Sequence, residues 1–114
     1  MAACAARTHG SAFASFVETR REGFQLLSGA ATVRVYASSP GVEWHFCAGC
    51  GAKLLFVMHA QRDLLWVAAG ALDDALERRP AYPLFVASKA PWFTIHDNLP
   101  QHATYPAAVL NAQA

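Results

Sequence analysis

Hydrophobic residues recur along the chain in short runs that are separated by glycine, proline and polar residues. Within the runs, β-branched and aromatic side chains are frequent or alternate with polar ones, which is typical of β-strands. The runs that we interpret as strands are Ala12–Val17, Phe24–Leu27, Thr32–Tyr36, Glu43–Phe46, Lys53–Met58, Leu64–Ala68 and Leu84–Ala87. The pattern therefore predicts a mainly β fold of antiparallel hairpins.

Helix contributes little to this prediction. The only interior segment with a helical pattern is Asp73–Arg78, for which Asp73 is a suitable N-cap, and it is short. Neither a linker nor an internal repeat divides the chain, so we expect one domain over residues 1–106. The alanine-rich residues 107–114 have no periodic pattern and are expected to form a frayed tail.

The composition narrows the class of protein. Hydrophobic residues make up 54% of the 114 residues and charged residues 15%, which indicates a globular chain with an apolar core. The formal net charge is +1 and the basic residues are scattered, which argues against nucleic acid as a partner. No apolar run is long enough to span a membrane, and an odd number of cysteines, 3, favours a reducing compartment. We therefore expect a cytoplasmic protein with no membrane association.

A pair of cysteines gives the clearest chemical signal. Cys47 and Cys50 lie three positions apart, with Gly49 between them and Gly51 directly after them. This C-x2-C spacing supplies two of the four ligands of a tetrahedral zinc site. A strand pattern follows Gly51, so the pair is expected on the turn of a β-hairpin, whereas a redox pair of the thioredoxin type starts a helix. A thiol redox pair, or two buried cysteines in a tight turn, are the alternatives.

Further zinc ligands are scarce in the sequence. The third cysteine is Cys4, and among the five histidines His9 and His45 are the ones we consider as ligands. His45 precedes Cys47 by two residues, so on a strand the two side chains face the same side. Cys4 and one histidine would complete a site of three cysteines and one histidine with the C-x2-C pair.

Several sequence blocks, taken together, resemble the glutathione-dependent formaldehyde-activating enzyme family, which also includes centromere protein V. The resemblance extends from about Arg7 to His102. The blocks are Ser38-Ser39-Pro40-Gly41, Phe46-Cys47-Ala48-Gly49-Cys50-Gly51, Ala69-Gly70-Ala71-Leu72-Asp73-Asp74, Ala87-Ser88-Lys89-Ala90-Pro91-Trp92 and Asp97-Asn98-Leu99-Pro100. The resemblance implies a fold of coiled β-hairpins and a carbon-sulfur lyase activity that forms S-(hydroxymethyl)glutathione from glutathione and formaldehyde.

The resemblance also implies zinc as the cofactor. In that family a structural zinc is held by an early C-x-C together with a C-x2-C that matches Cys47 and Cys50, and a second, catalytic zinc by a C-x-C-x2-C run. This sequence lacks the early C-x-C, keeps only Cys4 of the second run, and has Ala5 where the last ligand is expected. Cys4 is thus the one candidate catalytic residue. We expect an impaired lyase; the alternative is a binding or scaffold module, able to form a homo-oligomer, that has lost zinc.

Substrate binding has four candidates. The carboxylates of glutathione, or of another small thiol adduct, call for a fixed cation, which Arg7, Arg34 or Lys89 would provide. Trp92 follows Lys89 by three residues and would line a pocket for a peptide-like ligand. The alternative for Trp92 is packing beneath the Lys89 stem or within an aromatic core.

Overall fold

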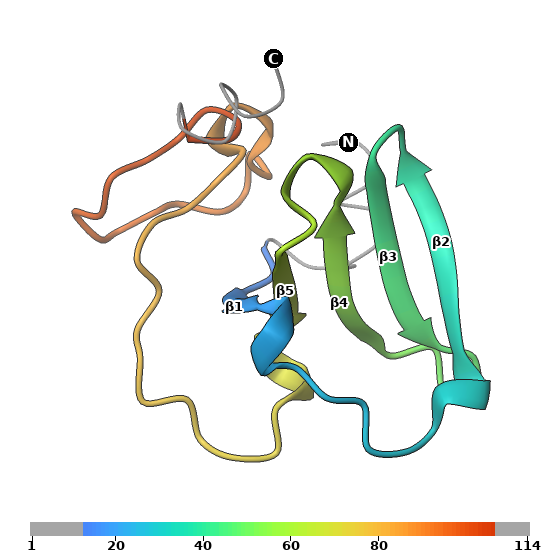
Figure 1. The fold of residues 1–114 in the computed structure, drawn as a ribbon. Coiled ribbons are helices and arrows are strands. Elements are labelled where there is room, and N and C mark those ends of the chain that lie inside the picture. The colour runs from blue at the N-terminus through green and yellow to red at the C-terminus, as the bar shows by residue number, and fades with distance from the viewer. Residues whose placement is uncertain (1–12, 107–114) are drawn as a thin grey trace. The chain divides into compact units, whose positions relative to one another are not determined.

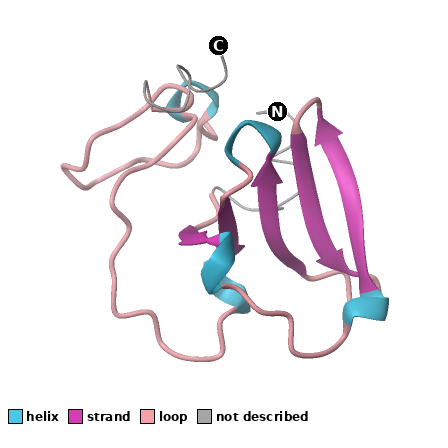
Figure 2. Ribbon diagram, in the orientation of Figure 1, coloured by secondary structure: helices cyan, strands magenta, loops and turns pink. Residues whose placement is uncertain are grey.

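The structure is a computed structural model, and it describes residues 13–106. A five-stranded antiparallel sheet dominates these residues (Figure 1). Its strands are β1 (Phe16–Arg20), β2 (Val33–Ser39), β3 (Val42–Cys47), β4 (Lys53–Met58) and β5 (Leu64–Ala68). The helices in the described part of the chain are 3₁₀ turns of 3 residues each (Figure 2). They are η1 (Arg21–Gly23), η2 (Ala30–Thr32), η3 (His59–Gln61), η4 (Ala69–Ala71) and η5 (Val86–Ser88). The prediction of a mainly β fold is confirmed.

The strand order in the sheet is β1-β5-β4-β3-β2. Strands β2 to β5 follow one another as a meander, whereas β1 pairs with β5 at the far edge (Figure 1). The hairpin between β2 and β3 turns at Pro40-Gly41, where Gly41 adopts a φ of +79° that favours glycine. Beyond β1, the backbone N–H of Arg21 donates to the carbonyl of Asp63 at 2.8 Å. This hydrogen bond continues the β1–β5 pairing by one position beyond Arg20 and Leu64.

The centre of the sheet is apolar on both faces. On one face Leu55 and Val57 of β4 pack with Leu65, and the half-buried Val67 packs against them. Strand β4 is buried continuously from Leu55 to Met58, as expected for a central strand whose two faces are both covered. The sheet therefore has a core that needs no metal to bury apolar surface.

Aromatic rings form the core on the other face. Phe56 stacks on Trp66 with ring centroids 5.1 Å apart, and the ring of Trp44 lies 4.9 Å from Phe56. Phe16 of β1 meets Phe56 edge-on at 5.0 Å. Such aromatic pairs are each worth about 0.5–1.5 kcal/mol beyond the area they bury. Because Trp44 belongs to β3, this cluster helps to fix the strand that ends at Cys47.

Three of the predicted elements are wrong. The segment Phe24–Leu27 is exposed and pairs with no strand; Phe24 N–H donates to the Arg21 carbonyl at 3.1 Å and so closes the turn η1 instead of joining a strand. Asp73–Arg78 is an exposed loop, since so short a segment gains too few hydrogen bonds to nucleate a helix. In Leu84–Ala87, Phe85 has a φ of +55°, and this left-handed conformation breaks an extended strand.

The described residues divide into two compact units. Ser15–Leu76, with all five strands, form one; residues 13–14 and 77–106 belong to the other. In the second unit, Val86 N–H donates to His102 at 3.0 Å, and the ring of Phe85 meets that of Tyr105 edge-on at 4.8 Å. Burial raises the pKa of the Tyr105 hydroxyl. None of the helices among residues 13–106 is long and apolar enough to cross a membrane.

Candidate metal centre

The turn between β3 and β4 carries both cysteines of the C-x2-C motif. Cys47 is the last residue of β3, and Cys50 lies in the turn that leads to β4. The backbone N–H of Cys47 donates to Ala52 at 2.8 Å, and that of Gly51 donates to Cys47 at 2.7 Å, which closes the turn. Gly51 has a φ of +79°, a conformation that a side chain at this position would strain. The prediction of a cysteine pair on a hairpin turn is confirmed.

The turn directs hydrogen-bond donors at one sulfur. The pKa of the Cys47 thiol is held below its usual value. The largest cause is a hydrogen bond from the Cys50 backbone N–H, and smaller ones are the Gly49 backbone N–H and the Cys50 side chain. The Cα of Gly49 passes so close that a methyl group there would lie 3.6 Å from Cys47 Sγ. Both cysteines are free thiols. Amide donors that stabilise a thiolate suit it as a metal ligand, because the ligand form of cysteine is the thiolate.

The turn is also tied to the neighbouring strand. Ala48 N–H donates to the carbonyl of Thr32 at 2.8 Å, and Val33 is the register partner of Cys47. The Arg34 guanidinium donates to the carbonyls of Ala31 and Val33, at 2.7 and 3.1 Å. A fixed cation therefore lies beside the strand position that faces Cys47.

The residues that the structure describes contain two free thiols but no complete metal site. Cys47 and Cys50 supply two adjacent thiols, but no group of three or more His, Cys, Asp or Glu among residues 13–106 is arranged to hold a metal ion. The predicted Cys4, Arg7 and His9 lie outside the described residues. Two donors do not satisfy the four-coordinate preference of structural zinc, so the described residues do not complete the site.

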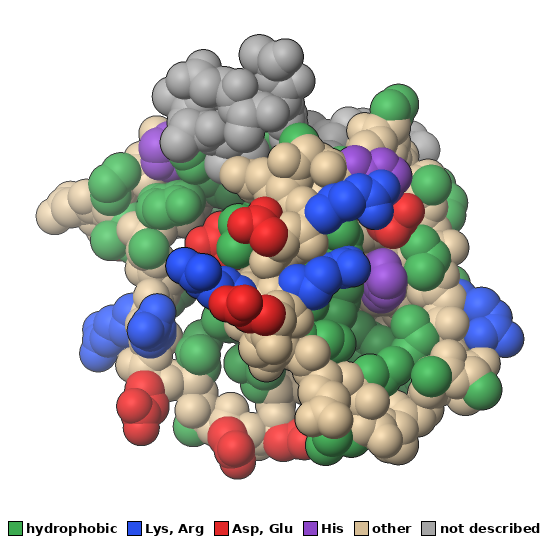
Figure 3. All heavy atoms as spheres, viewed as in Figure 1, with side chains coloured by type: hydrophobic (Ala, Val, Ile, Leu, Met, Phe, Trp, Pro, Cys, Tyr) green, Lys and Arg blue, Asp and Glu red, His purple; other side chains and the backbone are tan. Residues whose placement is uncertain are grey.

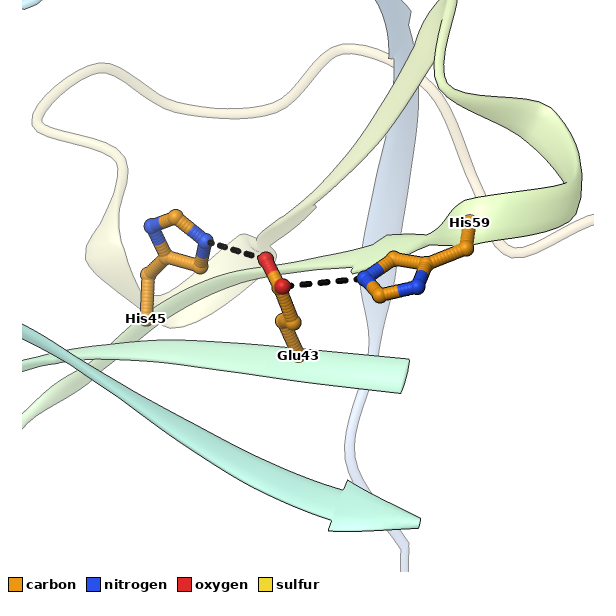
Figure 4. A network of polar contacts seen from close by, with 3 residues as sticks. All are labelled: Glu43, His45 and His59. Carbon is orange, nitrogen blue, oxygen red and sulfur yellow. Dashed lines mark hydrogen bonds and ion pairs between the residues drawn. The ribbon is translucent and has the colours of Figure 1, made fainter. Parts of the chain in front are cut away.

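His45, the other candidate ligand, belongs to a separate polar cluster (Figure 4). His59 Nε2–H donates to Glu43 Oε1 at 2.9 Å, while His45 Nε2 lies 3.8 Å from Glu43 Oε2 and forms no hydrogen bond. The carboxylate thus lies between two imidazoles, one from β3 and one from η3. The hydrogen bond from His59 lowers the pKa of Glu43 most, burial opposes it, and the charges of His59, His45 and Arg62 lower it further.

Sequence reasoning missed this cluster. A signal for half of it exists, since Glu43 and His45 are two residues apart and share one face of a strand. The other half depends on register: Glu43 faces Val57 in β4, and the chain then turns so that His59 N–H donates to the Gly41 carbonyl at 2.8 Å. Only the pairing of β3 with β4 brings His59 within hydrogen-bonding distance of Glu43.

The substrate-binding candidates in the second unit occupy different environments. Lys89 Nζ donates to the backbone carbonyls of Ala90 and Phe93, so its charge holds a local turn. Trp92 is 74% exposed, which places its ring in solvent and not beneath the lysine stem. Phe93 pairs with Phe13 at 5.2 Å. Of the two candidates, Trp92 is thus the side chain that a ligand can reach without breaking a hydrogen bond.

The face drawn in Figure 3 shows Lys and Arg side chains interspersed with Asp and Glu. On this face the basic groups do not gather into a single-sign patch.

Comparison with known proteins identifies the fold family. The family described as "Glutathione-dependent formaldehyde-activating enzyme" matches residues 2–88, which include the whole sheet and the Cys47–Cys50 turn. The chain belongs to this family. No curated protein matches the sequence. The sequence resemblance is confirmed over residues 2–88, and members of this family typically bind zinc.

Proposed function

We propose that this member of the formaldehyde-activating enzyme family is a carbon-sulfur lyase of the S-(hydroxymethyl)glutathione synthase type whose catalytic step is impaired. One observation carries the proposal. The chain belongs to a family whose members typically bind zinc and carries two free thiols on one hairpin turn, while residues 13–106 lack a group of three donor residues. The chain thus keeps the family fold and the half of the structural site that its C-x2-C supplies.

The reaction shows why the missing ligands matter. The glutathione thiolate attacks the carbonyl carbon of formaldehyde, a carbon-sulfur bond forms, and the former carbonyl oxygen takes up a proton. A thiol with a pKa of about 8.5 is mostly protonated at neutral pH, so a catalyst must stabilise the thiolate with a local positive charge. Zinc on three protein ligands would supply that charge, and the described residues do not offer three.

Binding of the adduct is the part of the function that the described residues support. Trp92 offers an exposed ring on which a peptide-like ligand would pack. Lys89 is the cation nearest in sequence, but it would have to exchange its two backbone carbonyl partners for a ligand carboxylate. We therefore assign Trp92 the main contact and Lys89 a role in shaping the turn beneath it.

The test of catalysis is NMR exchange between free glutathione and its hydroxymethyl adduct in a mixture with formaldehyde. We expect the exchange rate with protein, with or without added zinc, to equal the rate without protein. An acceleration that Cys4→Ser abolishes would show a working metal site and contradict the impairment. Cys50→Ser in the same assay would show whether the turn takes part in such a site.

A binding experiment separates an impaired lyase from a scaffold that does not bind thiol adducts. S-methylglutathione serves as a stable analogue, and its binding is followed by isothermal titration calorimetry. We expect Trp92→Ala to weaken binding about tenfold and Tyr82→Ala, which removes an exposed ring elsewhere in the same unit, to leave it unchanged. No binding by the native chain would favour the scaffold.

A further inference from the structure

Strand β2 has a neighbouring strand on one side only. It lies at the edge of the sheet next to β3, and no strand among residues 13–106 pairs with its other side (Figure 1). Residues 34–37 of this strand are exposed. Of the exposed large hydrophobic residues in the described part of the chain, Val35 and Tyr36, at 53% and 58%, are the two that lie in a strand. A further strand at this edge would therefore bury apolar surface.

The hydrogen bonds around β2 show which of its backbone groups point outward. Ala48 N–H donates to the Thr32 carbonyl, so Thr32 faces β3, and along an antiparallel strand the residues that face one partner alternate. The register partner of Val33 agrees with this assignment, since Cys47 N–H donates to Ala52, on the side of β4. The residues that direct their N–H and C=O groups to the open side are therefore Val33, Val35 and Ala37.

We propose that two copies of this chain pair through their β2 strands, antiparallel and with Val35 on the two-fold axis. In this register Val35 lies opposite Val35 of the second copy, and Val33 lies opposite its Ala37. Because these are the outward residues, about six backbone hydrogen bonds join the two copies. The regular part of β2 is used in full, since the bulge between Ala37 and Ser39 lies just beyond it. This inference concerns assembly and does not depend on the proposed lyase activity.

The same register makes the side chains of the edge complementary to those of a second copy. Arg34 lies opposite Tyr36 of the second copy in a pair without hydrogen bonds, where the Cα atoms are about 4.5 Å apart. A cation beside an aromatic ring is favourable, and the two arginines do not face each other. Arg34 is the one charged residue of β2, and the formal net charge of the chain is +1, so repulsion between copies is small. A two-fold contact requires such a self-complementary surface.

The other edge strand of the sheet, β1, is less suited to pairing. It contains Glu18 and Arg20, and charged residues on an edge discourage a further strand. In β2, by contrast, Arg34 donates to the carbonyls of Ala31 and Val33 in its own chain. A carbonyl oxygen has two lone pairs, so the Val33 carbonyl is able to accept a second bond from the other copy. A contact through one strand buries less than about 1,200 Å² in total, so we expect a weak, concentration-dependent dimer.

The experiment is sedimentation equilibrium of the full chain between about 1 μM and 1 mM, with a chelator present so that no metal joins the copies. We expect the average molar mass to rise with concentration from 12.3 kDa toward twice that value. Hydrogen exchange at the Val35 amide should slow over the same range, whereas exchange at the Tyr36 amide, which faces β3, should not change. A monomer at every concentration, or exchange at Val35 that does not slow, would overturn the proposal.

Variants of the outward backbone test whether β2 forms the contact. Val35→Pro removes an N–H that points to the open side, so it takes no hydrogen bond from the β2–β3 pairing, and edge strands tolerate proline at such positions. We expect it to raise the Kd of the dimer about tenfold or more. Val35→Thr is the matched control, because it keeps the N–H and a β-branched side chain, and it should change the Kd little. A dimer that persists unchanged in Val35→Pro would overturn the proposal.

Charge variants at Tyr36 test the register. Tyr36→Lys places a cation opposite Arg34 of the second copy and should weaken the dimer, whereas Tyr36→Glu places an acid there and should not. Tyr36 is exposed, so circular dichroism should show that both variants fold, and they decide the result if Val35→Pro does not fold. Equal weakening by the two Tyr36 variants would overturn the proposed pairing.

Discussion

The sheet unit Ser15–Leu76 and the segment 77–106 are built on different principles. In the sheet unit, strand register and a buried core fix each residue against several others, so that Cys47 and Cys50 have defined donors around them. Segment 77–106 contains a single 3₁₀ turn, η5, and its order rests on scattered backbone hydrogen bonds and ring pairs. Metal binding, which needs ligands at fixed positions, is therefore expected at the hairpin turn. Ligand contacts that allow side chains to rearrange are expected in segment 77–106.

The largest expected effect is the loss of a core side chain in the sheet. Leu65 is 3% exposed, whereas Leu84 in the other unit is 39% exposed. We expect Leu65→Ala to lower the free energy of unfolding by about 2–5 kcal/mol, because it leaves a cavity. Leu84→Ala should cost less than about 1 kcal/mol, because its side chain is partly solvated before the change. Urea denaturation, followed by tryptophan fluorescence, measures both.

Equal losses in Leu65→Ala and Leu84→Ala would contradict this comparison. They would show that segment 77–106 is as tightly packed as the sheet. The fluorescence of Trp44 and Trp66 reports on the sheet unit, since both rings belong to its aromatic cluster. Far-ultraviolet circular dichroism serves as a second probe, and a difference between the two curves would show that the units unfold separately.

A smaller effect should distinguish the two glycines of the turn. Gly51 has a φ of +79°, so Gly51→Ala should cost about 1–2 kcal/mol, the strain of a left-handed residue with a side chain. Gly49→Ala is the matched control, because its added methyl group makes only an ordinary contact at 3.6 Å from Cys47 Sγ. The midpoint of thermal unfolding should fall in the first variant and stay nearly unchanged in the second. The reverse order would disprove the turn geometry.

The fold was predictable where apolar runs of five or six residues are bounded by turn residues. Lys53–Met58 and Leu64–Ala68 are strands with the predicted bounds, and Glu43–Phe46 lies within β3. The predicted strand Ala12–Val17 overlaps β1, but β1 begins at Phe16 and continues to Arg20 because it pairs with β5 along that length. That pairing joins residues about fifty positions apart, and no local pattern reveals it.

The candidate site was predictable only in its local part. Cys47 and Cys50 could be placed on a hairpin turn, because the motif, the glycines and the following strand all lie within a few residues. The interaction partners of residues far apart in the sequence could not be predicted. His59 donates to Glu43 only because β3 pairs with β4, and the sequence does not display that pairing.

The smallest expected effect concerns the pH dependence of the sheet unit. The pKa of Glu43 is lowered from its ordinary value of 4.5, first by the hydrogen bond from His59. A carboxyl group with a lowered pKa in the folded state stabilises the fold fully above its unfolded pKa, and this contribution is lost as the pH falls through the folded pKa. Glu43→Gln should therefore be slightly less stable than the native chain at pH 7. Below about pH 4.5 its stability should fall less steeply.

The measurement is a series of urea midpoints between about pH 7 and pH 3, because other carboxylates titrate in both proteins and only the difference between them reports on Glu43. His59→Gln is the partner variant, and the double variant completes a cycle. If the His59 hydrogen bond is the main cause, the effect of Glu43→Gln should nearly vanish in a His59→Gln background. An effect that survives there would instead assign the pKa shift to His45 and Arg62, whose charges act on the same carboxylate.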